Sequence, residues 1–247
     1  MVVSNMTNEY INDGGHGGSD PGAGANGHIE KVYTLEAAAY VNRRLNELGI
    51  KSSMTRTSDV TLGSTKRTNI VKQSRATVCL SHHFNAGGGD GTETIHSIYS
   101  DGKLSSLIVK SIAAAGVNFR KAYSKKGANG DYFFMHRLTG NVQTIIVEYE
   151  FLDGPNNAKL KDKAFRERLY EAVVKAVCEY EDVTYKAPGK EVAVVPKPVN
   201  ITPSATHAGA WEWATEKDLM NGERPGDPVT REQLATILKR YDEQNKN

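Results

Sequence analysis

Over residues 10–180, the spacing of hydrophobic residues alternates between a pattern typical of helices and one typical of strands. Apolar side chains recur at helical spacing in several segments, separated by short apolar runs that are typical of strands. The first predicted helix starts between Ile29 and Thr34 and has its apolar positions between Leu35 and Leu48. Further helices are predicted at residues 65–73, 104–117 and 160–180. The predicted strands are a short one beginning at Tyr10 and others at 52–55, 76–81, 92–99 and 143–147. This alternation predicts an α/β fold with a mostly parallel sheet flanked by helices.

The composition changes beyond Tyr180. Residues 186–203 contain Pro188, Pro196, Pro198 and Pro203 without a helical period, which is typical of an extended linker. Helices are predicted again at 211–219 and from Thr230, where Gln233 completes a capping box. We therefore expect a main domain at 1–182, a Pro-rich linker at 183–206 and a small helical module at 207–247. So short a module buries little surface alone, so docking, a homodimer or ligand binding is expected of it.

Composition and charge exclude several classes of protein. The net charge of +2 is too small for the dense basic face of a nucleic-acid-binding domain. No segment predicts a membrane span, and residues 1–10 lack the charged start and apolar core of a secretory signal peptide. Cys79 and Cys178 are too sparse for a disulfide framework, so both are expected to be free thiols.

Candidate metal ligands stand at predicted strand and helix ends. A catalytic zinc site uses three protein ligands and keeps a fourth position open. His16 follows a glycine-rich turn, Glu30 lies at a helix start, and His82 and His83 follow a buried strand. Adjacent strand residues face opposite sides, so one of these two histidines is expected to be a ligand and the other structural. Glu148 ends an apolar strand, where a carboxylate needs a partner or a function.

Each candidate also has a simpler interpretation when it is taken alone. A histidine in a glycine loop is often a turn residue, and most glutamates in a first helical turn are solvated and favoured by the helix dipole. We expect ordinary polar or packing roles for the other histidines, which are His28, His96, His136 and His207.

Several short motifs, taken together in their order along the chain, favour the metal-binding interpretation of these residues. Residues 13–23 are similar to Asp-x-Gly-His-Gly-Gly followed by Asp-Pro-Gly-Ala, 27–30 to Gly-x-x-Glu, 55–59 to Thr-Arg-x-x-Asp, 81–86 to Ser-[Ile/Leu]-His-x-Asn-Ala, and 147–152 to Val-Glu-x-Gly-Phe-[Leu/Ile]. In this order they resemble the zinc-dependent N-acetylmuramoyl-L-alanine amidases of autolysins and phage endolysins.

The resemblance implies roles for individual residues. His16, Glu30 and His83, rather than His82, would hold Zn²⁺, and Glu148 would be catalytic. The family fold has about six strands flanked by helices. The reaction would cleave the amide that joins N-acetylmuramic acid to L-alanine in bacterial peptidoglycan, with Glu148 passing the water proton to the departing amine. Asn85 would position the substrate or support a ligand.

Two positions depart from the family pattern. Glu150 stands where the family has glycine, so we expect it to crowd the site or perturb Glu148. Gly14 replaces a proline that is common in the family, which is a milder change. A non-catalytic wall-binding protein is therefore an alternative, and so is a zinc peptidase or deacetylase that acts on other wall bonds.

The C-terminal module and the missing signal peptide suggest how the protein reaches its substrate. Residues 211–222 and 228–235 resemble one S-layer-homology repeat, which implies attachment to a secondary wall polymer. A helical pair for dimerisation or docking is the alternative. The lack of a signal peptide predicts a phage endolysin that reaches the cell wall by holin-type release. A bacterial autolysin freed by mother-cell lysis is the alternative.

Overall fold

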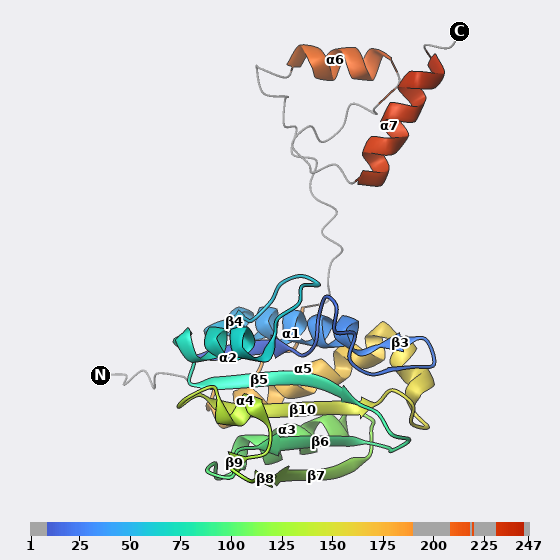
Figure 1. Cartoon of the computed structure of the whole chain (residues 1–247). Coiled ribbons are helices and arrows are strands. Elements are labelled where there is room, and N and C mark those ends of the chain that lie inside the picture. Colours follow the sequence, from blue (N-terminus) through green and yellow to red (C-terminus); the bar gives the residue numbers. More distant parts are fainter. Residues whose placement is uncertain (1–8, 190–207, 218, 220–230, 245–247) are drawn as a thin grey trace. The chain divides into compact units, whose positions relative to one another are not determined.

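The computed structural model describes residues 9–189, 208–217, 219 and 231–244. The chain divides into two compact units, Met1–Ala187 and Pro188–Asn247 (Figure 1). The first unit contains every site residue that the sequence predicts.

A six-stranded sheet forms the centre of the first unit, in the order β4-β1-β5-β10-β6-β7. Its strands are β1 (Tyr10–Gly14), β4 (Ser52–Met54), β5 (Val78–Asn85), β6 (Thr92–His96), β7 (Phe119–Ser124) and β10 (Gln143–Phe151). Neighbours pair in parallel except β10 and β6, which are antiparallel. The predicted α/β fold with a mostly parallel six-stranded sheet is confirmed.

Helices cover both faces of this sheet (Figure 1). On one face, α1 (Glu30–Glu47), α3 (Lys103–Ala114) and α5 (Lys163–Tyr180) bury their apolar stripes in the larger core. On the other face, α2 (Ser64–Gln73) and the short α4 (Phe134–Arg137) contact each other, and α4 contacts β10. A smaller core there contains Ile11, Cys79, Ile95, Met135 and Ile146.

Short elements complete the first unit. The two-stranded sheets are β2 (Gly24–Ala25) with β3 (His28–Ile29) and β8 (Lys126–Gly127) with β9 (Gly130–Asp131). A 3₁₀ turn at Asn157–Lys161 precedes α5. The helix itself begins after Asp162, whose carboxylate accepts a hydrogen bond from the Ala164 amide at 2.9 Å.

Several strands differ from the sequence prediction: β10 continues four residues past the predicted end at Val147, and β6 ends at His96 rather than Tyr99. The strand predicted at 76–81 continues to Asn85, so both histidines lie inside β5 rather than after it. The edge strand β7 was not predicted. Its sequence, Phe-Arg-Lys-Ala-Tyr-Ser, has mostly exposed positions and two cations, so it lacks the apolar run that marks a buried strand.

The chain follows the first unit for several residues beyond α5. Val183 and Tyr185 pack against the larger core. The Lys186 carbonyl accepts a hydrogen bond at 2.7 Å from the guanidinium of Arg44, which also pairs with Glu171. Residues 183–186 are thereby fastened to this unit.

The described part of the second unit contains α6 (Ala208–Glu216) and α7 (Arg231–Gln244). The rings of Trp213 and Tyr241 lie 6.0 Å apart, and Ala214 and Leu219 are buried. Thr230, the predicted cap, lies outside the described residues. Among the helices described in the two units, none has the length and apolarity needed to span a membrane.

Candidate metal centre and active site

The site forms where the carboxyl ends of β1, β5 and β10 meet the start of α1. The loop after β1 carries His16, β5 carries His83, and the first helical residue of α1 is Glu30. On β10, Glu148 is the register partner of His83. Four residues that are far apart in the sequence therefore share one edge of the sheet, as expected for ligand sites of open α/β sheets.

His16, Glu30 and His83 offer one ligand atom each, and these atoms lie within 4.8 Å of one another. The Glu30 carboxylate bridges the two rings: its Oε2 lies 3.1 Å from His16 Nε2 and its Oε1 lies 2.9 Å from His83 Nδ1. Two imidazoles and one carboxylate are a known ligand set of catalytic zinc sites. The three predicted ligands are thus close enough together for one ion to contact all of them.

Two glycines make room for these side chains. A Cβ on Gly15 would lie 2.2 Å from the His83 ring, and one on Gly22 would lie 2.6 Å from Glu30 Oε2. Gly22 also has φ +68°, a conformation that glycine adopts without strain. A side chain at either position would push a predicted ligand out of place, which explains the glycines around His16 in the sequence.

Hydrogen bonds orient the three predicted ligands. Asp20 Oδ2 lies 2.9 Å from His16 Nδ1, leaving Nε2 to face Glu30. The amides of Ala23 and Phe84 donate to the Glu30 carboxylate at 2.8 and 3.1 Å. Such outer partners fix the tautomer and direction of metal ligands.

The pKa shifts in this cluster follow from its charges. Burial lowers the pKa of His16, but hydrogen bonds and charge from Glu30 and Asp20 outweigh this and raise it to about 9. Burial raises the pKa of Glu30, but hydrogen bonds from His16 and His83 outweigh it, and the net shift is downward. Glu30 therefore stays ionised, as a metal ligand must be.

The carboxyl group of Glu148 differs from that of Glu30 in its hydrogen bonding and in its pKa. Its Oε2 is buried and has no hydrogen-bond partner among the described residues. Burial raises its pKa to about 7, aided by the charges of Glu30 and Glu93 and opposed by that of His83. A carboxyl group with a pKa near neutrality can both accept and donate a proton, as a general acid–base catalyst requires.

His82 faces the opposite side of β5 from His83. It is fully buried, with Nδ1 2.8 Å from the Tyr149 hydroxyl and Nε2 2.9 Å from Asn12 Oδ1. Burial lowers its pKa to about 3, so the ring is neutral. The structure gives it a packing role and leaves His83 at the site.

A buried ion pair supports the first loop from behind, and sequence reasoning assigned it no role. Asp13, fully buried, accepts hydrogen bonds from Thr55 and Ser81 at 2.7 and 2.8 Å and pairs with Arg67. Arg67 also donates to the His16 carbonyl at 2.6 Å. The available signal was a charged residue inside an apolar strand, which needs a partner.

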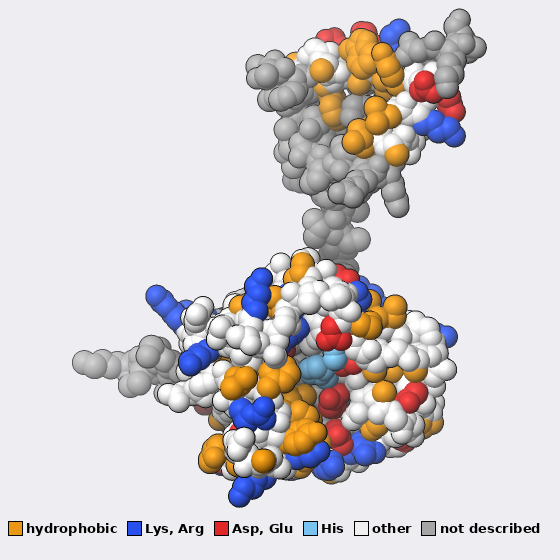
Figure 2. Space-filling view, in the orientation of Figure 1, with side chains coloured by type: hydrophobic (Ala, Val, Ile, Leu, Met, Phe, Trp, Pro, Cys, Tyr) orange, Lys and Arg blue, Asp and Glu red, His pale blue; other side chains and the backbone are white. Residues whose placement is uncertain are grey.

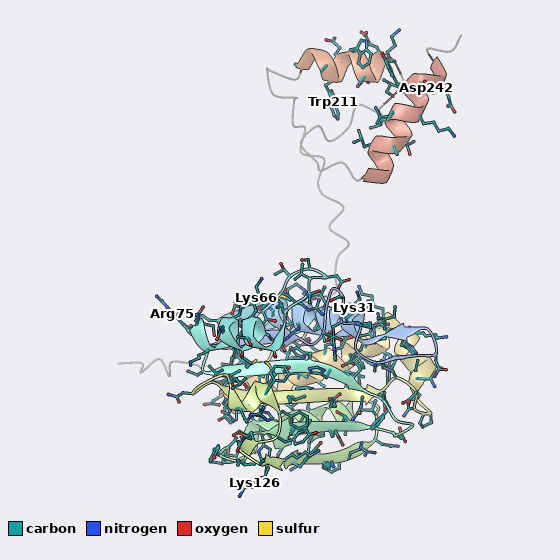
Figure 3. All side chains as sticks on the ribbon, viewed as in Figure 1. Lys31, Lys66, Arg75, Lys126, Trp211 and Asp242 are labelled. Atoms are coloured by element: carbon teal, nitrogen blue, oxygen red, sulfur yellow. The ribbon has the colours of Figure 1, made fainter. Side chains whose placement is uncertain are left out.

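The loop around residues 17–20 is tied down from outside. Lys31, labelled in Figure 3, donates at 2.7 Å to both the Gly18 carbonyl and Asp59 Oδ2. Asp59 in turn accepts from the Gly18 amide at 2.6 Å. These contacts give the Thr-Arg-x-x-Asp motif a physical role, since its last residue anchors the loop that carries His16.

Asn85 lies next to the predicted ligands but is not one of them. Its amide donates to Glu93 Oε1 at 3.3 Å, and it lines the same cavity as His83. Glu93 was missed in the sequence, although it faces Glu148 directly across the β10–β6 pair. Pairing between distant strands cannot be read from local patterns, so no sequence signal pointed to Glu93.

Glu150 does not enter the cavity, contrary to expectation. Its carboxylate accepts from the Gly91 amide at 2.7 Å, from the Phe151 amide at 2.9 Å and from Asn156 at 3.3 Å. A register irregularity in β10 after Glu148 breaks the alternation that would have aimed Glu150 beside it. Glu150 instead ties the 86–91 loop to the end of β10.

The site opens into a cavity of about 540 Å³. Its lining includes the predicted ligands, Glu148 and four apolar side chains, Phe133, Phe134, Met135 and Ile146. Figure 2 shows histidine at the surface of this face, between acidic and hydrophobic side chains. A larger hollow of about 950 Å³ lies around residues 97–101 and 136–144 and contains none of the predicted site residues.

The sequence profile of the N-acetylmuramoyl-L-alanine amidase family matches residues 12–179. The chain is similar to the N-acetylmuramoyl-L-alanine amidase CwlM of Bacillus licheniformis, with 38% identity over 156 residues, covering 62% of this chain and 60% of that protein. It is also similar to the sporulation-specific N-acetylmuramoyl-L-alanine amidase of Bacillus subtilis, with 34% identity over 160 residues, covering 64% of this chain and 62% of that protein.

The matched segment thus spans about three fifths of the length of these two relatives. Among solved structures, the catalytic domain of the amidase CwlV from Bacillus (Paenibacillus) polymyxa superposes with a TM-score of 0.64 at 25% identity. The superposition covers 72% of this chain and 99% of that domain.

Proposed function

Because the chain belongs to the N-acetylmuramoyl-L-alanine amidase family, we propose that it hydrolyses the amide bond between N-acetylmuramic acid and L-alanine in peptidoglycan, with Zn²⁺ as cofactor. One observation carries the proposal. Two imidazoles and a carboxylate converge next to Glu148, a carboxyl group with a buried oxygen that lacks a partner among the described residues. A ligand cluster beside a proton-exchanging group is what amide hydrolysis requires.

The donor set fits zinc. His16, Glu30 and His83 would hold the ion, and their outer hydrogen bonds already fix their directions. When bound, Zn²⁺ supplies a Lewis acid that polarises the carbonyl and makes water a better nucleophile near neutral pH.

Glu148 performs the proton transfers in this proposal. It takes a proton from the attacking water as the new carbon–oxygen bond forms. It then gives that proton to the amide nitrogen as the carbon–nitrogen bond breaks, so that the stem peptide leaves with a neutral amino group on its L-alanine. Burial, which raises the pKa of Glu148, favours its acting as both proton acceptor and proton donor. Phe133 and Met135 add apolar surface to the cavity in which these steps take place.

The relatives bear on how the protein is used. CwlM and the second amidase both come from Bacillus species, and the second is named as sporulation-specific. This supports the autolysin alternative over the phage endolysin expected from the sequence. Both routes share the same chemistry at the site.

The proposed role of the second unit is attachment to a secondary wall polymer. Trp213 and Tyr241 are each 46% exposed, and Leu234 and Leu238 are exposed on α7. Such an apolar surface suits either a polymer or a second copy of the chain. Sedimentation with purified walls, compared for the full chain and for residues 1–187, tests the first. The oligomeric state of the full chain tests the second.

Product analysis tests the reaction itself. The zinc-loaded protein is incubated with purified peptidoglycan, and new amino termini and reducing sugars are measured. We expect free L-alanine amino groups without new reducing ends. Other amino termini would indicate a peptidase, released acetate a deacetylase, and binding without turnover a wall-binding protein.

A further inference from the structure

The sheet face that carries Glu148 continues past the catalytic cavity onto β6 and β7. Glu148 is the register partner of Glu93, and Glu93 is the register partner of Lys121. Directly paired residues of neighbouring strands project from the same face of a sheet. These three side chains therefore form a row that starts at the predicted proton donor and ends at the edge strand.

The inner part of the row is neutralised. Glu93 is 6% exposed, and its carboxylate accepts from Arg120 Nε at 3.1 Å and from the Tyr123 hydroxyl at 3.3 Å. The Arg120 guanidinium also lies 4.9 Å from the centroid of the Phe151 ring. Glu93 is thus held in place, and its negative charge is already paired.

The outer end of the row carries positive charge. Lys121 is exposed, and its Nζ lies 4.0 Å from the centroid of the Tyr123 ring, over the same sheet face. No carboxylate of the described residues forms an ion pair with it. Figure 2 shows basic side chains along this edge of the face, beyond the acidic ones near the histidine.

The proposed reaction indicates which part of the substrate lies along this row. The nitrogen that receives the proton from Glu148 belongs to the stem peptide, so the peptide leaves the site on the Glu148 side, toward β6 and β7. Two strand spacings separate Glu148 from Lys121, about 10 Å. An extended peptide covers about 3.3–3.6 Å per residue, which brings roughly its third residue to Lys121.

We infer that Lys121 binds a carboxylate near the third residue of the stem peptide and so favours acidic stem peptides. The inference rests on the proposed function. An exposed ion pair of this kind contributes up to about 1 kcal/mol, or about fivefold in affinity. This contact is equally strong in the ground state and the transition state, so it changes KM and leaves kcat unchanged.

The test uses two muropeptides that differ only in the third residue, which carries either a free carboxylate or its carboxamide. Wild-type protein is expected to cleave the carboxylate form with about fivefold higher kcat/KM. Lys121→Gln should remove this preference by raising KM for the carboxylate form alone, and Lys121→Glu should reverse it. Lys110→Gln is the matched control, because Lys110 is an exposed lysine of α3 on the opposite face of the sheet.

Equal cleavage of the two muropeptides by wild-type protein would overturn the inference and leave the proposed function intact. An equal loss on both substrates in Lys121→Gln would also overturn it, since that pattern indicates a general defect. If zinc-loaded wild-type protein cleaves neither muropeptide, the proposed function itself fails and the inference fails with it.

Discussion

The two neighbouring histidines of β5 have the same side chain and opposite environments. His82 is fully buried, both of its ring nitrogens have partners, and burial lowers its pKa to about 3. The side chain of His83 is 21% exposed, and burial lowers its pKa, but the hydrogen bond to Glu30 and the charge of Glu148 raise it overall. The face of the strand, rather than the residue type, decides which histidine can bind a metal.

Two buried acids, Asp13 and Glu148, also differ in whether their carboxylate oxygens have hydrogen-bond partners. Asp13 has every contact it needs, from Thr55, Ser81 and Arg67, whereas Glu148 has a buried oxygen without a described partner. Buried polar groups in folded proteins are usually paired, and an exception calls for an explanation. Asp13 therefore contributes to the stability of the fold, whereas the unpartnered oxygen of Glu148 fits the proton-transfer role proposed for it.

The largest expected effect comes from Glu148→Gln. The amide keeps the shape of the side chain but cannot carry the proton, so turnover of peptidoglycan should fall by about 10²- to 10⁴-fold. Zinc content should match wild type, because Glu148 is not one of the three predicted ligands. Turnover within threefold (roughly the noise of such assays) would remove the proposed proton transfer.

Asp13→Asn should lower stability most among the supporting residues. The substitution leaves the Arg67 guanidinium buried, at 5% side-chain exposure, without its counter-charge. Breaking a buried pair in this way costs about 3–5 kcal/mol. Urea unfolding of both proteins at neutral pH measures the loss. A difference below roughly 1 kcal/mol would mean that the pair does not stabilise the fold.

A smaller loss is expected from His82→Gln, which leaves Asn12 and the Tyr149 hydroxyl with poorly matched partners. Such unsatisfied buried groups cost about 1–3 kcal/mol. Zinc content and stoichiometry should not change. Zinc loss in this variant equal to that in a His83 variant would show that the two faces of β5 are not independent.

The smallest expected effect near neutral pH is a pH dependence of stability that His82 contributes. Its pKa is about 3 in the folded protein and about 6.5 when unfolded, so the unfolded chain binds the extra proton first as pH falls. The free energy of unfolding is therefore highest above pH 6.5 and decreases between about 6.5 and 3, by about 1.4 kcal/mol at pH 5.5. Urea unfolding at several pH values should show a weaker decrease in His82→Gln than in wild type.

The sequence predicted those site residues that are marked by a strand end, a helix start or a short motif. The end of a strand, the start of a helix and the family motifs pointed to His16, Glu30, His83 and Glu148, and the structure brings these four together on one rim of the parallel sheet. Alternation showed that the two histidines of β5 face opposite sides, but the family resemblance was needed to choose between them.

What sequence reasoning missed depends on contacts between distant segments. Glu93 and Lys121 become relevant only through strand pairing, and their edge strand β7 has no apolar run. Glu150 was expected to crowd the site or perturb Glu148 because it stands where the family has glycine, and in a regular strand it would share a face with Glu148. The irregularity in β10 breaks that rule, and nothing in the local sequence announces it.

Zinc stoichiometry is the most direct test of the central claim, that one ion is held by His16, Glu30 and His83. Metal-depleted protein is titrated with Zn²⁺ by calorimetry, and bound metal is quantified in wild type, His83→Ala and His82→Gln. We expect one Zn²⁺ per chain in wild type and in His82→Gln, and a large loss of affinity in His83→Ala. A wild-type protein that binds no zinc, or a His83→Ala variant that binds it as tightly as wild type, would contradict the account.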